Sequence, residues 1–240
     1  ETITNEEFIH KMASSKSLPK TSQPPLGKFV EMFDKLGEDG SQIISFNMLE
    51  AISGTVHTAE QAAQLSKADV TVIDSQFTDR ALAFQVLEAA KMAQEGASKD
   101  EIIQRAEYIR NHTKLYLSVV NLENLVKGGR LSKIGGMLGG LLNIKLLLEV
   151  KNGKLDVAGK VRGMKAMKKL WSDIYTEMQG SGKIKGVGIS HVEAFDMVED
   201  MKKHVGEFFP VNDIVVRETV PIIATHTGMG AFCILYYSED

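Results

Sequence analysis

The side chains best suited to chemistry in this chain are hydroxyls carried by two short segments. Thr21 and Ser22 precede a Gln and two prolines, and Ser53, Gly54 and Thr55 form a Ser-Gly-Thr triplet after an apolar run. Hydroxyls and free backbone N–H groups at the start of a helix suit an anion, and Gly lets a backbone approach a ligand closely. Each segment is also typical of an ordinary helix cap.

Two further segments carry groups that could meet the same anion. Arg130 follows a pair of glycines, and a guanidinium fixed by a sharp turn suits a carboxylate or a phosphate. His226 stands with Thr227 and Gly228 in a run of small residues that we expect to form a loop between two strands. The alternatives are an exposed loop arginine and a structural histidine.

Several reaction classes lack their sequence signature. No Gly-Lys-Ser/Thr phosphate loop is present, no Gly-x-Ser-x-Gly elbow surrounds Ser53, and no Cys and His spacing predicts a metal site. Ser53 and His226 could still serve as nucleophile and base of a hydrolase, although no acidic residue is evident to orient the imidazole. We therefore predict neither a metal nor a cofactor.

The composition is that of a soluble globular protein of one or two domains. Of 240 residues, 43% are hydrophobic and 25% are charged. Lys and Arg number 28 against 31 Asp and Glu, so the electrostatic case for nucleic-acid binding is absent. The single Cys233 cannot form an internal disulfide. The apolar run 134–142 is too short to span a bilayer. We expect a cytoplasmic protein.

The first half alternates strands and helices. We expect strands over 42–46 and 70–73, and helices over 55–65, 80–94 and 98–112. Alternating strands and helices favour a parallel sheet with helices on both faces. Residues 1–114 are therefore predicted to be an α/β domain.

The second half changes character. Asn152-Gly153 between two apolar runs predicts a β-hairpin, and further strands are expected near 115–120, 184–190, 213–218 and 232–237. Helices are expected over 163–178 and 193–205. Residues 115–240 are therefore predicted to be an α+β domain with a mixed or antiparallel six-stranded sheet. A ligand is expected between the two domains.

Two remaining segments have alternative interpretations. The glycines at 135, 136, 139 and 140 alternate with leucines, which indicates close packing or a pliant lid over an apolar cavity. A basic helix face is either solvated or a docking surface for an acidic partner or an anionic lipid. Its members are Lys160, Arg162, Lys165, Lys168 and Lys169.

The order of these motifs along the whole chain resembles the DegV family. The matching segments are Thr21-Ser22-Gln23-Pro24, Ser53-Gly54-Thr55, Asp74-Ser75, Gly128-Gly129-Arg130-Leu131-Ser132, and His226 with Gly228 and Gly230. The chain looks most like the fatty-acid-binding subunits of bacterial fatty acid kinase. Family members open with a strand and an Asp-Ser loop that have no counterpart here, so the resemblance implies an incomplete N-terminus. Many relatives also have Pro in place of Met229.

The resemblance implies a long-chain fatty acid held in a buried tunnel. Thr21 and Ser53 would hydrogen-bond its carboxyl group, His226 would contact that group or orient the hydroxyls, and Arg130 would complete the polar network. Supporting positions would be Ser22, Gly54, Thr55, Thr227 and Gly228. Burial of a sixteen-carbon chain at ~0.8 kcal/mol per methylene contributes on the order of 12 kcal/mol before entropic costs.

The resemblance also implies that a separate protein carries out the catalytic step. A separate ATP-dependent kinase would phosphorylate the bound carboxylate to an acyl phosphate, and this chain would exchange the product with the inner face of the membrane, without being catalytic alone. The alternatives are a carrier with no kinase partner and a kinase substrate domain for a small ketone of the dihydroxyacetone type.

Overall fold

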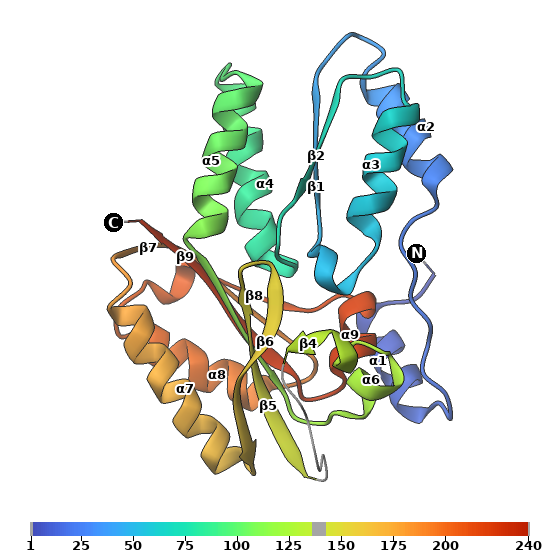
Figure 1. The fold of residues 1–240 in the computed structure, drawn as a ribbon. Helices are drawn as coiled ribbons and strands as arrows, with labels where there is room; N and C mark the ends of the chain where they lie inside the picture. The colour runs from blue at the N-terminus through green and yellow to red at the C-terminus, as the bar shows by residue number, and fades with distance from the viewer. Residues whose placement is uncertain (1, 136–142, 240) are drawn as a thin grey trace. The chain divides into compact units, whose positions relative to one another are not determined.

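The computed structural model describes residues 2–135 and 143–239 (Figure 1). The chain forms two compact units. The small unit consists of Ser22–Asn111 with Asn152–Lys154, and the large unit consists of Glu1–Thr21, His112–Lys151 and Leu155–Asp240. The chain therefore passes into the large unit close to the expected boundary after residue 114.

The first 21 residues differ from that expectation, because they belong to the large unit. Their helix α1 (Asn5–Ser14) begins with a capping box at Thr4 and Glu7. Its buried Ile9 and Met12 pack against Ala224, which is far away in the sequence. This apolar contact attaches the segment to the second half of the chain.

The small unit confirms the predicted parallel sheet with helices on both faces. Its elements are α2 (Leu26–Leu36), β1 (Ile43–Asn47), η1 (Glu50–Ile52), α3 (Thr55–Leu65), β2 (Val70–Asp74), α4 (Asp79–Gln94) and α5 (Lys99–Asn111). Strands β1 and β2 pair in parallel, with Ile43 opposite Val70. Ile43 packs against α2 and α3, whereas Ile44 and Phe46 line a cavity of about 350 Å³ against alanines of α4. Successive side chains thus face opposite helix layers.

The large unit confirms the mixed sheet. Its further elements are β3 (Thr113–Val119), α6 (Glu123–Lys127), η2 (Leu131–Lys133), β4 (Ile134–Gly135), β5 (Ile144–Lys151), β6 (Lys154–Arg162), α7 (Met164–Gln179), β7 (Lys183–His191), α8 (Phe195–Val205), η3 (Val211–Asp213), β8 (Ile214–Glu218), α9 (Pro221–Thr227) and β9 (Phe232–Glu239). In the described residues the strand order is β4-β6-β5-β3-β9-β7-β8. The six predicted strands are all present, and the two-residue β4 is added to them.

The strands of this sheet run in both directions. Strands β3 and β9 are antiparallel, as are β3 and β5, whereas β7 and β8 are parallel. The hairpin turn between β5 and β6 has positive φ at both Asn152 (50°) and Gly153 (67°). Positive φ at both central residues defines the tight turn that the Asn-Gly pair predicts.

The two faces of the large sheet pack against different helices. On one face, Trp171 of α7 donates a hydrogen bond from Nε1 to Ser118 Oγ (2.8 Å), within the main apolar core. On the other face, Leu117 packs with the cluster formed by α1 and α9. The strand register places Val119 beside Leu146, and both share the face of Leu117. The second face is thus an apolar layer next to α9.

Candidate functional site

His226 is positioned by a short helix rather than by the expected loop. Helix α9 begins at Pro221, a residue suited to the first helical position. It ends where Gly228 adopts a φ of 75°, a conformation that glycine adopts without strain. His226 therefore lies in the last turn of a seven-residue helix, which holds its backbone more firmly than a loop would.

The large unit brings His226 together with Thr21. The Nε2 atom of His226 lies 2.8 Å from Thr21 Oγ1, although the two residues are 205 positions apart. On the other side of the ring, Nδ1 is buried and has no hydrogen-bond partner among the described residues. A Cβ atom added to Gly128 would lie only 2.3 Å from Nδ1. The imidazole is therefore confined between a hydroxyl and the backbone of Gly128.

Arg130 completes the polar group in the large unit. Its Nη1 atom donates to the carbonyl oxygen of Gly128 (2.9 Å), so the guanidinium is anchored to the residue that confines the imidazole. Burial lowers the pKa of His226, and the positive charge of Arg130 lowers this pKa further. The site thus combines a neutral imidazole with a permanently charged guanidinium.

The contacts of His226 assign its tautomer. A proton on Nδ1 would be a buried donor without an acceptor, whereas a lone pair there is the less costly alternative. The proton therefore belongs on Nε2, which donates to Thr21 Oγ1. The hydroxyl of Thr21 then keeps its own proton for another acceptor. This arrangement makes Thr21 a hydrogen-bond donor toward an anion.

The neighbouring predicted residues Thr227 and Gly228 have structural roles. The hydroxyl of Thr227 donates to the carbonyl oxygen of Ile223 (3.1 Å) within α9. A Cβ atom at Gly228 would lie 2.9 Å from Asn124 Oδ1, so close packing adds to the requirement for glycine at this position. Both residues support the end of the helix that carries His226.

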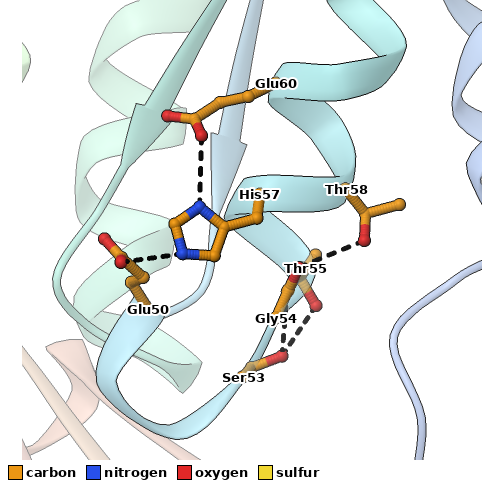
Figure 2. Close-up of polar contacts among 7 residues, drawn as sticks. All are labelled: Glu50, Ser53, Gly54, Thr55, His57, Thr58 and Glu60. Carbon is orange, nitrogen blue, oxygen red and sulfur yellow. Dashed lines mark hydrogen bonds and ion pairs between the residues drawn. The ribbon is translucent and has the colours of Figure 1, made fainter.

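The small unit carries the second polar motif at the start of α3. Ser53 Oγ and Thr55 Oγ1 are 2.8 Å apart, and the backbone N–H of Thr55 donates to Ser53 Oγ (3.3 Å; Figure 2). The N-cap residue of α3, Gly54, makes no side-chain capping hydrogen bond. The motif thus presents two hydroxyls beside helix N–H groups, which suits a negatively charged oxygen.

Gly54 is less constrained than its place in the motif predicts. A Cβ atom added there would meet Gln23 Nε2 at 3.4 Å, an ordinary contact, and its φ is −77°. The fold therefore does not require glycine at position 54. Ser22 is exposed, and no contact of its side chain is part of the motif.

His57 lies beside this motif in a different environment. Its Nε2 atom is 3.0 Å from Glu50 Oε1, and its Nδ1 atom is 3.3 Å from Glu60 Oε2 (Figure 2). The hydrogen bond to Glu60 and the charge of Glu50 raise the pKa of His57. Since an imidazole donates from both nitrogens only when protonated, the two carboxylates favour the protonated form of His57, which in that form joins η1 to α3. The sequence around His57 shows no ligand spacing and predicts only a surface or core residue.

The Asp-Ser pair at the end of β2 is part of the framework. Ser75 is fully buried and donates from Oγ to the carbonyl oxygen of Asn47 (2.7 Å), which joins the ends of β1 and β2. Asp74 accepts a hydrogen bond from the backbone N–H of Gln76 (2.8 Å), while burial raises the pKa of its carboxyl group. These contacts shape the loop that follows the strand.

A cavity of about 800 Å³ lies beside α6 in the large unit. Its apolar lining includes Leu122 and Val126. An α-helix turns by 100° per residue, so Leu122 and Val126 lie on the opposite side of α6 from Asn124 and Gly128. Asn124 and Gly128 face α9. Helix α6 therefore separates this cavity from the imidazole of His226.

Two other expectations concern the large unit. The basic face is exposed at all five of its residues, and Lys168 pairs with Asp200 of α8 (2.9 Å). The expected lid, residues 135–142, lies almost entirely outside the described residues.

Across the described residues, no helix is long and apolar enough to cross a bilayer, and no group of three or more His, Cys, Asp or Glu side chains could hold a metal ion.

The fold and the two motifs define a two-unit α/β protein with hydroxyl groups suited to an anionic ligand in each unit. A model of the DegV family, described as uncharacterised, matches residues 1–239. The chain is also 47% identical over 229 residues to a DegV domain-containing protein of Streptococcus pneumoniae, covering 95% of this chain and 81% of that protein. The chain belongs to the DegV family.

Solved structures of the family have the same fold. The fatty acid binding DegV family protein of Streptococcus agalactiae superimposes with a TM-score of 0.88 at 27% identity, covering 99% of this chain and 85% of that one. A DegV family protein of Thermus thermophilus, described for its fatty acid binding, gives 0.87 at 31% identity, covering 100% and 86%. Both are similar to this chain over nearly its whole length.

Proposed function

We propose that this protein binds a long-chain fatty acid and presents its carboxylate to a separate ATP-dependent kinase, which forms the acyl phosphate. Fatty acid binding by two structural relatives supports the first part. The observation that carries the proposal is the contact between Thr21 and His226, 2.8 Å apart. His226 lies on α9, a helix that packs against an apolar sheet face.

The polar groups match the needs of a carboxylate. A carboxylate removed from water costs several kcal/mol unless hydrogen bonds and a positive charge replace the lost hydration. In this proposal, Thr21 donates its hydroxyl proton and Arg130 supplies the charge. His226 orients Thr21 and remains neutral, so the site keeps one net positive charge.

The apolar layer of the large sheet suits the hydrocarbon chain. Leu117 packs with Ala224 of α9, and Val119, Leu146 and Leu148 lie on the same face of the sheet. In this proposal the carboxylate lies at His226 and the chain extends along this layer. Each methylene that leaves water contributes ~0.8 kcal/mol, which makes chain length a determinant of affinity.

The kinase and the membrane belong to the second part of the proposal. The sequence contains no Gly-Lys-Ser/Thr phosphate-binding loop, and in this proposal a partner binds ATP. The exposed basic face on β6 and α7 suits an acidic partner or the anionic surface of the inner membrane leaflet. In this proposal the protein acts in the cytoplasm and visits the membrane to exchange its acyl phosphate product.

The decisive experiment is native mass spectrometry of the purified protein, followed by kinase assays. A co-purifying long-chain fatty acid is expected, and its absence together with failure to bind added palmitate contradicts fatty acid binding. Addition of a bacterial fatty acid kinase and ATP should then yield acyl phosphate. Binding without turnover by any such kinase would identify a carrier. Lys165→Glu serves as a docking variant, because it should slow turnover without changing palmitate affinity.

A further inference from the structure

Asn124 connects the helix that carries His226 to the helix that confines its ring. Its side-chain Nδ2 donates to the carbonyl oxygen of Thr225 (2.9 Å), the residue directly before His226. Carbonyls in the last turn of a helix lack an intrahelical partner, so this bond caps α9 from outside. Its Oδ1 atom lies close against Gly228, two residues after His226. The amide therefore contacts α9 on both sides of the histidine.

The backbone of Asn124 acts on the other side of the imidazole. Its carbonyl oxygen accepts the N–H of Gly128 (2.8 Å), which closes the turn at the end of α6. That turn places Gly128 so close to His226 Nδ1 that no side chain fits between them. One residue thus holds both the backbone of the histidine and the surface against which its ring packs.

We propose that Asn124 is a positioning residue, which holds His226 as the Nε2–H tautomer and so leaves the Thr21 hydroxyl as a donor to the ligand. The part of this inference that concerns the ligand rests on the proposed function. The part that concerns the imidazole does not. If the amide is lost, α9 can shift along α6, water or another acceptor can reach Nδ1, and the Nδ1–H tautomer becomes accessible.

The test measures the ring of His226 directly. Nitrogen NMR of protein with labelled histidine reports the tautomer and the pKa, and His226→Gln identifies the signal among the six histidines. In the wild type we expect Nε2–H at neutral pH. In Asn124→Ala we expect a mixture of tautomers, a pKa closer to the ordinary value, and palmitate affinity reduced roughly fivefold to tenfold, the equivalent of one hydrogen bond.

Asn121→Ala is the matched control. Asn121 Oδ1 accepts the backbone N–H of Glu123 (3.0 Å) at the start of the same helix, so its loss weakens α6 while Asn124 keeps its contacts with α9. The ring signals should not change in this variant. An unchanged tautomer in Asn124→Ala overturns the inference, and so does an equal change in both variants. If the wild type binds no palmitate, the proposed function fails, and the ring signals still decide the role of Asn124.

Discussion

His226 in the large unit and His57 in the small unit lie beside the two polar motifs, but in opposite electrostatic environments. His226 faces a hydroxyl on one side and a backbone on the other, with a guanidinium nearby, and its pKa is lowered. The side chain of His57 is 62% exposed between two carboxylates, and its pKa is raised. The surroundings of His226 favour the neutral imidazole, and those of His57 favour the protonated one.

The comparison extends to the glycine in each motif. Gly128 is compressed against His226, whereas Gly54 has room for a methyl group beside Gln23. The large-unit motif is therefore rigid before any ligand arrives, while the small-unit motif is open. Preorganised groups lose less entropy on binding, so the rigid motif is the better candidate for fixing the position of a carboxylate.

The largest contrast is expected from alanine at these two glycines. In Gly128→Ala the new methyl group would meet Nδ1 at 2.3 Å and the Asn124 carbonyl oxygen at 2.8 Å, which forces the backbone apart. We expect a loss of about 1–3 kcal/mol of unfolding free energy and most of the palmitate affinity. Gly54→Ala should leave stability within about 0.5 kcal/mol. Chemical denaturation and palmitate titration measure both variants.

Equal destabilisation by the two substitutions would remove the distinction between a rigid and an open motif. A selective loss of palmitate affinity in Gly54→Ala, at unchanged stability, would have a different meaning. It would indicate that the ligand approaches the backbone at position 54, because the fold itself tolerates a methyl group there.

The next contrast concerns the two hydroxyl donors. Thr21→Val preserves shape and removes the proposed donor, so palmitate affinity should fall roughly tenfold to a hundredfold, the value of a hydrogen bond to a charged group. Thr21→Ser should retain most of the affinity. Ser53→Ala should cost less, because Thr55 supplies a second hydroxyl 2.8 Å away. Isothermal titration of the two single variants and the double variant checks this order.

The double variant tests whether the two substitutions act independently on palmitate affinity. Coupled effects of Thr21→Val and Ser53→Ala would indicate one shared anion, and additive effects would indicate separate roles. An affinity for palmitate that Thr21→Val does not change would contradict the proposed carboxylate site.

The smallest contrast is the pH dependence of stability. In the folded protein, the pKa of His226 lies below the ordinary value of about 6.5. The contribution of His226 to the free energy of unfolding is therefore complete above about pH 6.5 and is lost as the pH falls through the folded-state pKa. In the folded protein, the pKa of His57 is raised. The contribution of His57 to the free energy of unfolding is therefore complete below about pH 6.5 and is lost as the pH rises through the folded-state pKa. His226→Gln and His57→Gln should therefore change the slope of unfolding free energy against pH in opposite directions.

Both slopes are measured by urea denaturation across this pH range, with the wild type as reference. His57 is highly exposed, so solvent screening should make its effect the smaller of the two. A change of the same sign in both variants would show that the environments of the two histidines do not differ in the way described.

Much of the fold follows from local pattern. Alternating strands and helices predicted the small unit, and the Asn152-Gly153 pair predicted the hairpin, because hydrophobic period and turn chemistry are properties of neighbouring residues. Helix α1 and the short α6 were not predicted, and α9 was predicted as a loop. Short helices depend on tertiary packing more than on propensity, so their sequences carry a weak signal.

The sequence by itself determined which groups are available: hydroxyls at Thr21 and Ser53, a guanidinium at Arg130 and an imidazole at His226. Only the tertiary structure decided that the imidazole meets Thr21 across 205 positions, that Gly128 confines it, and that Asn124 connects their helices. It also decided that the pKa values of His226 and His57 shift in opposite directions. The physical reason is that burial and neighbouring charge set a pKa, and both arise only when distant segments pack together.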